Sequence, residues 1–297
     1  MEKKISGWGN NIFAYSKVYF PKNIAEIKDL IKGKTIARGL GRSYGDSSIQ
    51  PQSTIITSRL NKIISFDAKK GFIEAEAGIS IEDILKVTLK KGWFLRVTPG
   101  SKRITLGGMI AANVHGKNHH KVGNFKNHII NLKMINETKK LITCSKNKNK
   151  KLFNYTVGGM GLTGIIYSCK FRLKKISSDT IIQEKIKNKN LRETINSIIM
   201  SNNWEYNVAW IDTSANKEQL GRSILTRGKF INKKTNKKKI SLGNSIKFYI
   251  PKIFPNWFMN KYLINFLNSL YFNYTNLKKK NTDIESFFYP LDKISNW

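Results

Sequence analysis

The sequence contains little cysteine and no long run of apolar residues. Only two of its 297 residues are cysteine, Cys144 and Cys169, and without a Cys-x-x-Cys pair neither a disulfide framework nor a zinc site is expected. Cys169 falls on an alternating strand pattern, which favours a small core residue. Since no stretch of about 20 apolar residues occurs, no transmembrane helix is predicted. The first residues also lack the apolar core of a signal peptide, so we expect a cytoplasmic protein, which could also associate with a membrane.

Acidic residues are scarce as well. The chain has 53 Lys and Arg against 19 Asp and Glu, a formal net charge of +34, which invites a partner such as nucleic acid or an anionic membrane. Arginine, the usual base-reading residue, is sparse, and the lysine runs at 233–234, 237–239 and 278–280 are typical of solvated loops. We therefore expect no nucleic-acid partner and a weak peripheral contact with an anionic membrane. A basic nucleic-acid-binding protein without catalysis remains the alternative from another class.

One glycine-rich loop carries the first chemical signal. The stretch Ala37-Arg38-Gly39-Leu40-Gly41-Arg42-Ser43-Tyr44-Gly45-Asp46 follows a short apolar strand pattern. Its three glycines allow a tight turn that exposes successive backbone N–H groups, and such amides form a concave anion site. The spacing G-x-G-x-x-x-G is one residue longer than the dinucleotide fingerprint. A glycine-rich surface turn is the alternative.

Three further glycine-bearing segments strengthen this signal. They cover residues 99–113, 114–120 and 157–166. Small residues at this density let backbone lie directly against a flat or extended ligand. Several such loops in one domain suggest a long cofactor that passes several of them.

These segments resemble a known family. Arg38 to Asp46, Thr105 to Gly108 and His115 to His120 are similar to the FAD-binding domain of the vanillyl-alcohol oxidase and p-cresol methylhydroxylase type, and in particular to the decaprenylphosphoryl-β-D-ribose oxidase family. The resemblance runs from Gly7 to the last residue. Further matches occur at 220–222, 254–256, 260–262 and 289–292.

The resemblance implies an FAD cofactor. Many relatives link the flavin covalently through a histidine in a Gly-His-Ser setting. Here the matching triplet is Gly41-Arg42-Ser43, and because arginine cannot form that bond, a non-covalent flavin is expected. The resemblance assigns these residues to FAD binding: Ala37, Arg38, Gly39, Leu40, Gly41, Arg42, Ser43, Tyr44, Gly45, Asp46, Gly100, Thr105, Leu106, Gly107, Gly108, Ala112, Asn113, Val114, His115, Gly116 and Ile166.

All four histidines lie close together in the sequence, at 115, 119, 120 and 128. The i, i+4 spacing of His115 and His119 would suit a zinc pair on a helix, but Gly116 and Asn118 disfavour a helix there and no Asp, Glu or Cys completes a ligand set. We predict no metal. A polar structural loop and a flavin and substrate loop remain the two interpretations.

The resemblance lays His115 and Gly116 along the flavin and Lys117 in the substrate pocket. It implies oxidation of a sugar hydroxyl, the 2′-OH of a polyprenyl-phosphate pentose, with a separate short-chain reductase completing epimerisation. Such chemistry needs a cation or base near the developing alkoxide, and Lys117 and His115 are the catalytic candidates. Trp210 and Phe288 match residues of the substrate pocket. For Lys117 the alternative is a solvated lysine, and for Trp210 and Phe288 it is that both are core aromatics. For the activity, the alternative is an aldonolactone or alditol oxidase acting on a soluble sugar.

The pattern of elements predicts an α+β fold. Strands are expected at 15–20, 54–57, 72–77 and 165–173, a hairpin at 130–134 and 141–144, and helices over 23–31 and after Ser80. In the strand at 72–77, Glu74 and Glu76 are expected to point outward.

Composition changes near residues 174–178, where a domain boundary is predicted. We expect a PCMH-type FAD-binding domain at 1–176 and a substrate (cap) domain on an antiparallel sheet at 177–297. Family chains continue beyond the 289–292 match, so the resemblance implies a substrate domain that is incomplete at its C-terminus.

Overall fold

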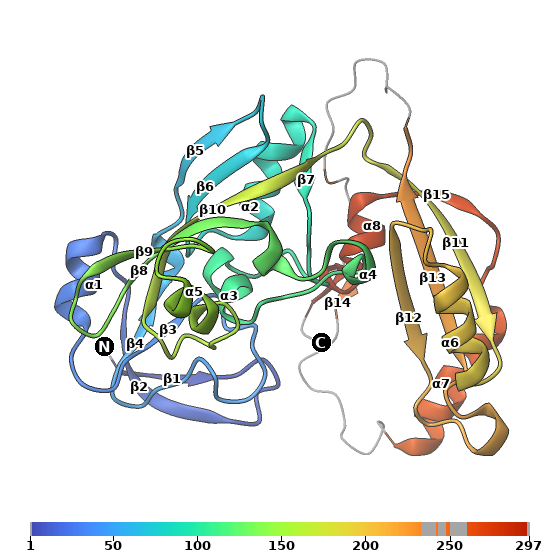
Figure 1. The fold of residues 1–297 in the computed structure, drawn as a ribbon. Helices are drawn as coiled ribbons and strands as arrows, with labels where there is room; N and C mark the ends of the chain where they lie inside the picture. The colour runs from blue at the N-terminus through green and yellow to red at the C-terminus, as the bar shows by residue number, and fades with distance from the viewer. Residues whose placement is uncertain (1, 233–241, 243–247, 250–259, 296–297) are drawn as a thin grey trace. The chain divides into compact units, whose positions relative to one another are not determined.

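The computed structural model describes residues 2–232, 242, 248–249 and 260–295 (Figure 1). The chain divides into two compact units. The first comprises Met1–Gly116 and Val122–Lys175, and the second comprises Lys117–Lys121 and Ile176–Trp297. The division after Lys175 lies next to the boundary predicted at 176. Residues 117–121, which the sequence assigned to the first domain, group with the second unit.

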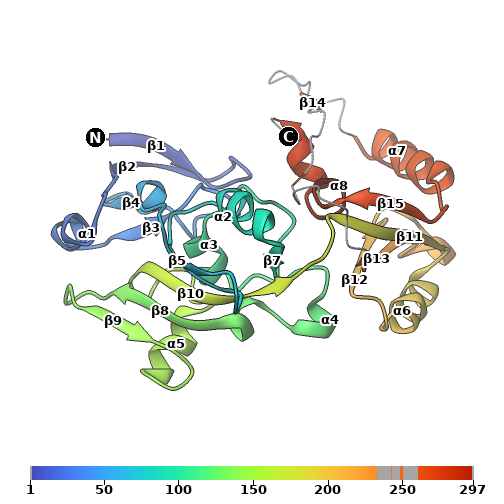
Figure 2. The same cartoon turned by 90° about the horizontal axis from the view of Figure 1, so that it is seen from above.

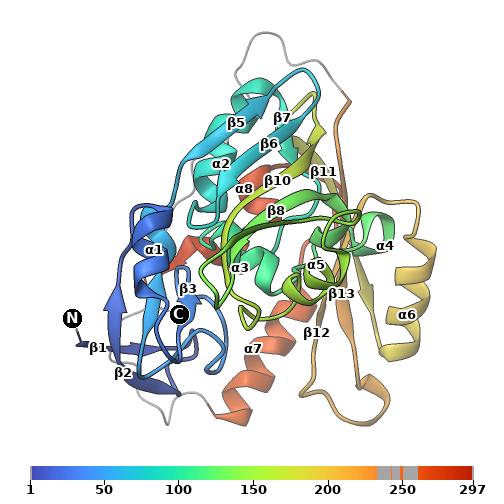
Figure 3. The ribbon, with the colours of Figure 1, turned by 60° about the vertical axis from the view of Figure 1, so that its left-hand side comes forward.

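The first unit contains two sheets. One has the order β1-β2-β4-β3, in which β1 and β2 are antiparallel and the other pairs are parallel. The other has the antiparallel order β5-β6-β10-β8-β9, with β7 also on β10 (Figure 3). The strands are β1 (Glu2–Ser6), β2 (Phe13–Tyr19), β3 (Ile36–Arg38), β4 (Thr54–Ile56), β5 (Ile63–Asp67), β6 (Phe72–Glu76), β7 (Trp93–Leu95), β8 (Ile129–Ile135), β9 (Leu141–Cys144) and β10 (Ile165–Lys175).

Three helices of this unit, α1, α2 and α3, begin at side-chain caps. The Asn23 side chain accepts a hydrogen bond from the Glu26 amide, that of Ser80 from the Asp83 amide, and that of Thr105 from the Gly108 amide. Each bond provides an acceptor for a first-turn amide that has none within the helix. The helices are α1 (Ile24–Leu30), α2 (Ile81–Thr88), α3 (Leu106–Ala111) and α5 (Lys150–Thr156), with α4 (His119–Val122) across the division and the 3₁₀ turns η1 (Thr57–Arg59), η2 (Leu89–Lys91) and η3 (Phe125–His128).

The core of the first unit lies on the inward face of β10. Cys169 and Phe171 are fully buried there, which confirms the strand at 165–173 and the core position of Cys169. The outward position predicted for Glu76 is wrong. Its side chain is 5% exposed and accepts hydrogen bonds from the Lys62 amide at 2.8 Å and the Tyr167 hydroxyl at 3.1 Å. These donors offset the cost of burying the carboxylate.

The second unit is built on an antiparallel sheet with the order β12-β13-β11-β15. Figure 2 shows α6 and α7 on opposite faces of this sheet. The elements are β11 (Thr180–Asn188), α6 (Leu191–Met200), β12 (Tyr206–Ile211), η4 (Lys217–Gln219), β13 (Ser223–Phe230), α7 (Lys261–Tyr274), β15 (Lys280–Asp283), α8 (Ile284–Phe288) and η6 (Pro290–Lys293), with β14 (Phe248–Tyr249) and β16 (Ile294–Ser295) as a separate parallel pair.

Two predictions concern residues outside the described ones, namely the lysine runs at 233–234 and 237–239 and the family match at 254–256. The third lysine run is exposed and occupies the connection from α7 into β15. Among the helices that the structure describes, none combines the length and apolar character needed to cross a bilayer.

Candidate flavin site

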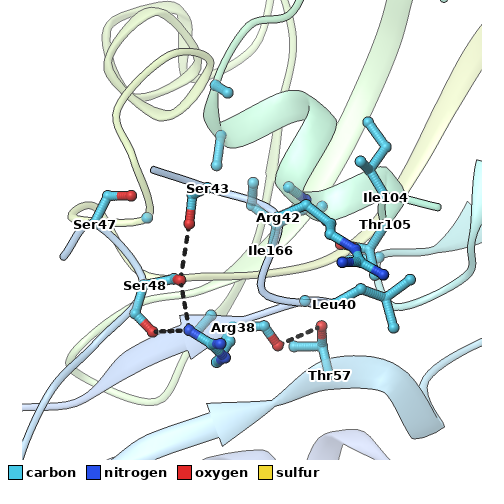
Figure 4. A pocket seen from close by; sticks show the side chains of 18 of the residues that line it. Arg38, Leu40, Arg42, Ser43, Ser47, Ser48, Thr57, Ile104, Thr105 and Ile166 are labelled. Carbon is cyan, nitrogen blue, oxygen red and sulfur yellow. Dashed lines mark hydrogen bonds between the residues drawn. The ribbon is translucent and has the colours of Figure 1, made fainter. Parts of the chain in front are cut away.

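An open pocket lies in the first unit, between the loop after β3, the helix α3 and the segment that leads into β10 (Figure 4). It encloses about 910 Å³, part of which is open to solvent. Ligand sites of this kind are concave, mostly apolar and carry a few placed polar groups. The lining fits this description, since Leu40, Ile104, Val114 and Ile166 lie there beside Arg42.

Glycine is required at three positions of the lining by backbone geometry or by close packing. Gly41 has φ +66°, and a Cβ there would overlap the Arg38 guanidinium. A Cβ at Gly39 would meet the Thr105 hydroxyl, and one at Gly107 would lie 3.0 Å from the Ala77 Cβ. The glycines therefore let the loop, α3 and the end of β6 approach one another closely around the pocket.

The loop after β3 offers backbone donors. Among the described residues, no hydrogen-bond acceptor is present for the amides of Gly39, Leu40 and Gly41, so these amides remain available to anionic oxygens. The first amides of α3 already have hydrogen-bond acceptors within the protein. The Leu106 amide donates to Ile79 at 2.9 Å and the Gly107 amide to Ala77 at 2.7 Å. The loop, rather than the start of α3, therefore provides the donors.

The two arginines of the loop have different surroundings. The Arg38 guanidinium donates to the Ser6 carbonyl at 2.6 Å and to the Ser48 hydroxyl at 3.1 Å, and the Ser48 hydroxyl lies 2.9 Å from that of Ser43. Burial lowers the pKa of Arg38. These hydrogen bonds of Arg38 hold the loop in place. The Arg42 guanidinium instead stacks 4.0 Å from the ring centre of Trp8.

The segment before β10 is tied to α3. The Gly158 amide donates to the Ile110 carbonyl at 3.1 Å, and the Met160 amide donates to Ala111 at 3.0 Å. Met160, Gly161 and Gly164 have positive φ values of +52°, +84° and +135°. This left-handed backbone returns the chain along the pocket wall before it enters β10.

Most of the predicted FAD residues lie in the pocket lining. The structure brings together Ala37, Arg38, Gly39, Leu40, Gly41, Arg42, Ser43, Thr105, Gly107, Gly108, Ala112, Val114 and Ile166. It places the others outside the lining: Tyr44, Gly45, Asp46, Gly100, Leu106, Asn113, His115 and Gly116. Tyr44 is 73% exposed and Leu106 is fully buried, so neither side chain contributes to the pocket in this arrangement.

Sequence reasoning missed several lining residues. They are Ser47, Ser48, Thr57, Ala77, Ile104, Ala111, Met160, Gly161 and Gly164. Gly161 and Gly164 belong to a glycine segment that the sequence already marks. Thr57 and Ala77 come from strand ends that join the site only through the sheets, so no local pattern identifies them.

No lining residue of the pocket, as described, is histidine or cysteine. Histidine, cysteine and tyrosine, which the described lining also lacks, can each link a flavin covalently, and the family resemblance places Arg42 at the position of the linking histidine. The lining therefore offers no covalent attachment point.

The histidine cluster does not form a metal site among the described residues. The ring Nε2 of His120 lies 2.9 Å from the Trp204 carbonyl oxygen and 3.3 Å from the Asn207 amide nitrogen. His128 is half-buried, and burial, as the largest cause, lowers its pKa. His119 and His120 are exposed and lie at the start of α4. The polar-loop interpretation fits His120, whose ring contacts backbone.

Lys117 belongs to the second unit. Its Nζ donates a hydrogen bond to the Phe287 carbonyl oxygen and lies 4.7 Å from the Phe287 ring centre and 5.9 Å from that of Phe288. The Asn207 amide donates to the Lys117 carbonyl at 2.7 Å. Burial lowers the pKa of Lys117 to about 8, because desolvation disfavours the charged ammonium. The solvated-lysine alternative is therefore wrong.

The structure brings Lys117 and Phe288 together, and Trp210 lies further along the same sheet. Phe288 is 1% exposed and packs 4.9 Å from the Tyr206 ring. Trp210 follows on the same face of β12 and packs 5.0 Å from the Tyr271 ring. Phe288 thus supports an aromatic wall from within the core, as the core-aromatic alternative expects, while Trp210 is part-exposed.

Comparison with known proteins identifies an FAD-binding domain and similar oxidases. Residues 16–145 match the FAD binding domain family. The chain is 29% identical to decaprenylphosphoryl-beta-D-ribose oxidase of Mycolicibacterium smegmatis over 99% of this chain and 68% of that protein. It is 26% identical to D-arabinono-1,4-lactone oxidase of Yarrowia lipolytica over 56% of this chain and 33% of that protein. It is also 26% identical to cytokinin dehydrogenase 1 of Arabidopsis thaliana over 53% of this chain and 30% of that protein.

Residues 16–145 match an FAD binding domain, the chain is an FAD-linked oxidoreductase, and its cofactor is FAD. The glycine-lined pocket with its available amides fits that cofactor. Over nearly its whole length the chain is similar to decaprenylphosphoryl-beta-D-ribose oxidase, of whose length it spans 68%. It spans a third or less of the lactone oxidase and the cytokinin dehydrogenase.

Proposed function

We propose that this flavoprotein oxidises the 2′-hydroxyl of a polyprenyl-phosphate pentose to a ketone. The observation that carries the proposal is the extent of the similarity. The relative named for decaprenylphosphoryl ribose aligns with 99% of this chain, including the whole second unit. The relatives named for lactones align with 69% of the chain or less. A substrate domain at 177–297 is part of the same proposal.

The first unit would hold FAD without a covalent bond. The amides of Gly39, Leu40 and Gly41 suit the pyrophosphate oxygens, and the apolar lining around Ile104 and Ile166 suits flat rings. Bound FAD supplies a hydride acceptor. Tyr44, Gly45, Asp46, Gly100, Leu106, Asn113, His115 and Gly116 remain proposed contacts that would require the loops carrying them to close on the cofactor.

Lys117 would stabilise the negative charge that develops on the substrate oxygen, and His115 would take up the hydroxyl proton. A hydroxyl that loses hydride from carbon must also lose its proton, and the developing alkoxide is stabilised by a nearby cation. The Lys117 ammonium, held by the Phe287 carbonyl, would supply that charge, and His115 would accept or relay the proton. Trp210 and Phe288 would form part of the sugar and lipid-phosphate pocket. A short-chain reductase would then reduce the ketone on the other face.

An aldonolactone or alditol oxidase is the second candidate. It is favoured by relatives named D-arabinono-1,4-lactone oxidase and L-gulonolactone oxidase, at 24–26% and 21% identity. These alignments cover only 56%, 69% and 62% of the chain, so they support the cofactor domain more than the substrate. A nucleic-acid-binding protein without catalysis is not supported, since the chain is an FAD-linked enzyme.

Product analysis tests the proposal. The purified protein with a dye acceptor is incubated in parallel with a polyprenyl-phosphate pentose and with an aldonolactone, and products are identified by mass spectrometry. We expect a lipid product lighter by two hydrogen atoms and no turnover of the lactone. Turnover of the lactone alone would favour the second candidate.

A further inference from the structure

The helix α7 sits on its sheet through polar side chains. The Asn268 amide nitrogen donates to the Asp212 carboxylate at 2.9 Å and to the Ser214 hydroxyl at 3.1 Å. The Arg222 guanidinium donates to the Ser269 hydroxyl at 3.0 Å and pairs with Asp212 at 2.8 Å. Asp212 is 1% exposed. The inner contact of α7 therefore combines a hydrogen-bonded network around a buried ion pair with the rings of Tyr271 and Phe272, which pack on Trp210 and on Arg222.

The outer face of the same helix is apolar. Tyr262, Phe266, Leu270 and Tyr274 are 75%, 59%, 37% and 81% exposed, and their i, i+4 spacing places them in one row. Leu267 is exposed beside them. A surface helix of a globular protein normally buries its apolar stripe and exposes its polar one. In α7 an apolar row is exposed instead.

The charged residues within α7 and the segment that follows it are all lysines. Residues 261–280 contain Lys261 and the run 278–280 and no carboxylate. The Lys187 ammonium of the underlying sheet also donates to the Asn273 carbonyl at 2.6 Å, at the C-terminal end of the helix. Cations thus flank an apolar row at both ends.

We propose that this α7 surface binds an anionic lipid membrane, with the helix lying in the plane of the interface. The α7 surface is defined as Tyr262, Phe266, Leu270, Tyr274, Lys261 and Lys278 to Lys280. Exposed aromatic and leucine side chains enter the headgroup and acyl boundary, and flanking lysines are attracted to anionic lipids. A second copy of this chain would bring the same lysines against each other, and like charges oppose that pairing. The inference does not depend on the proposed substrate.

Vesicle flotation tests the proposal directly. The purified full chain is mixed with vesicles of phosphatidylcholine alone or with phosphatidylglycerol added, and the bound fraction is measured. We expect binding to the anionic vesicles only, reduced by raised salt. The triple variant Tyr262→Ser, Phe266→Ser, Tyr274→Ser should bind at least about tenfold more weakly.

The second unit provides a matched control. Ile199 and Met200 on α6 are 66% and 79% exposed, so Ile199→Ser with Met200→Ser removes similar apolar surface from the opposite face of the sheet. This variant should float like the wild type. Equal flotation of the α7 triple variant and wild type would overturn the proposal, as would the absence of any flotation.

A site-specific label separates membrane contact from misfolding or self-association. Cys144 and Cys169 are fully buried, so an environment-sensitive dye can be attached selectively at Phe266→Cys or, as control, at Met200→Cys. We expect a blue shift with anionic vesicles at position 266 only. An unchanged emission at 266, or an oligomer that the α7 triple variant dissociates in light scattering without vesicles, would refute the membrane assignment. Flavin content of each variant reports independently on the cofactor site.

Discussion

Lys117 donates a hydrogen bond from Nζ to the carbonyl oxygen of Phe287, 170 residues further along the chain. The bond lies within the second unit, although Lys117 directly follows Gly116 of the first. Two phenylalanine rings lie close to the half-buried ammonium, and burial lowers the pKa of the amine to about 8. A titratable group perturbed in this way is a functional candidate.

Replacement of Lys117 should slow flavin reduction without loss of FAD. The pocket lining lies in the first unit and does not include Lys117, so Lys117→Ala should keep the wild-type flavin content. Loss of a cation that stabilises the developing alkoxide should lower the reduction rate about 10²-fold or more. Anaerobic stopped-flow mixing with substrate measures the rate.

Lys174 provides the control for Lys117. Its pKa is also lowered to about 8, by burial first and by Arg96 second, but it lies on β10 outside the pocket lining. The flavin of the Lys174→Ala variant should therefore be reduced by substrate at close to the wild-type rate. If Lys117→Ala also did so, the loop would be structural.

The pH profile of reduction should reveal the charge state of Lys117. Because its pKa is lowered to about 8, the ammonium is present below that pH and lost above it. If the cation assists, the ratio of reduction rate to substrate dissociation constant should fall as the pH rises through about 8. This ratio reports groups of the free enzyme. Lys117→Arg should remove the alkaline fall, and a rise through the same pH would instead make the neutral amine a base.

Gly41 should be essential for cofactor binding. Valine at a φ of +66° is strained, at a cost of about 1–3 kcal/mol, and its Cβ would overlap the Arg38 guanidinium. Gly41→Val should therefore lower the flavin-to-protein absorbance ratio sharply. Gly33 also has a positive φ, +60°, but it lies outside the pocket lining and the nearest atom to its Cβ position, Gln52 Oε1, is 3.7 Å away, so Gly33→Val should retain flavin. Equal flavin content in both variants would show that the loop is only a turn.

The flavin should leave the protein on denaturation. The pocket lining has no histidine or cysteine among its described residues, and Arg42 stands at the linking position. Acid precipitation should release all the flavin into the supernatant. Yellow colour retained in the pellet, with a flavinylated peptide in the digest, would contradict a non-covalent cofactor.

Local periodicity was sufficient to predict most elements of the first unit. The helix at 24–30, the helix after Ser80, the hairpin of β8 and β9, and β10 all have apolar residues at the spacing of their element. Such spacing decides which face is buried. It failed at Glu76, because the donors that allow burial come from Lys62 and Tyr167, which no local pattern connects to that carboxylate.

The sequence predicted only those parts of the site whose residues are neighbours along the chain. The loop from Ala37 to Ser43 is a continuous glycine signal and lines the pocket. Thr57 and Ala77 reach the pocket through strand pairing, and Lys117 joins Phe287 through tertiary packing. Such partners are distant in sequence, so composition and spacing do not identify them. The exposed apolar row of α7 was likewise not predictable, because the buried ion pair of Asp212 and Arg222 beneath the helix forms through tertiary packing.

Anaerobic reduction of the bound flavin tests the central claim most directly. The wild-type protein, loaded with FAD, is mixed with a polyprenyl-phosphate pentose and followed at the flavin absorbance band. Sugar-alcohol oxidation through this pocket predicts bleaching of the flavin, with a rate that depends on Lys117 and formation of the keto sugar. A flavin that remains oxidised with this substrate and with aldonolactones alike would contradict the account.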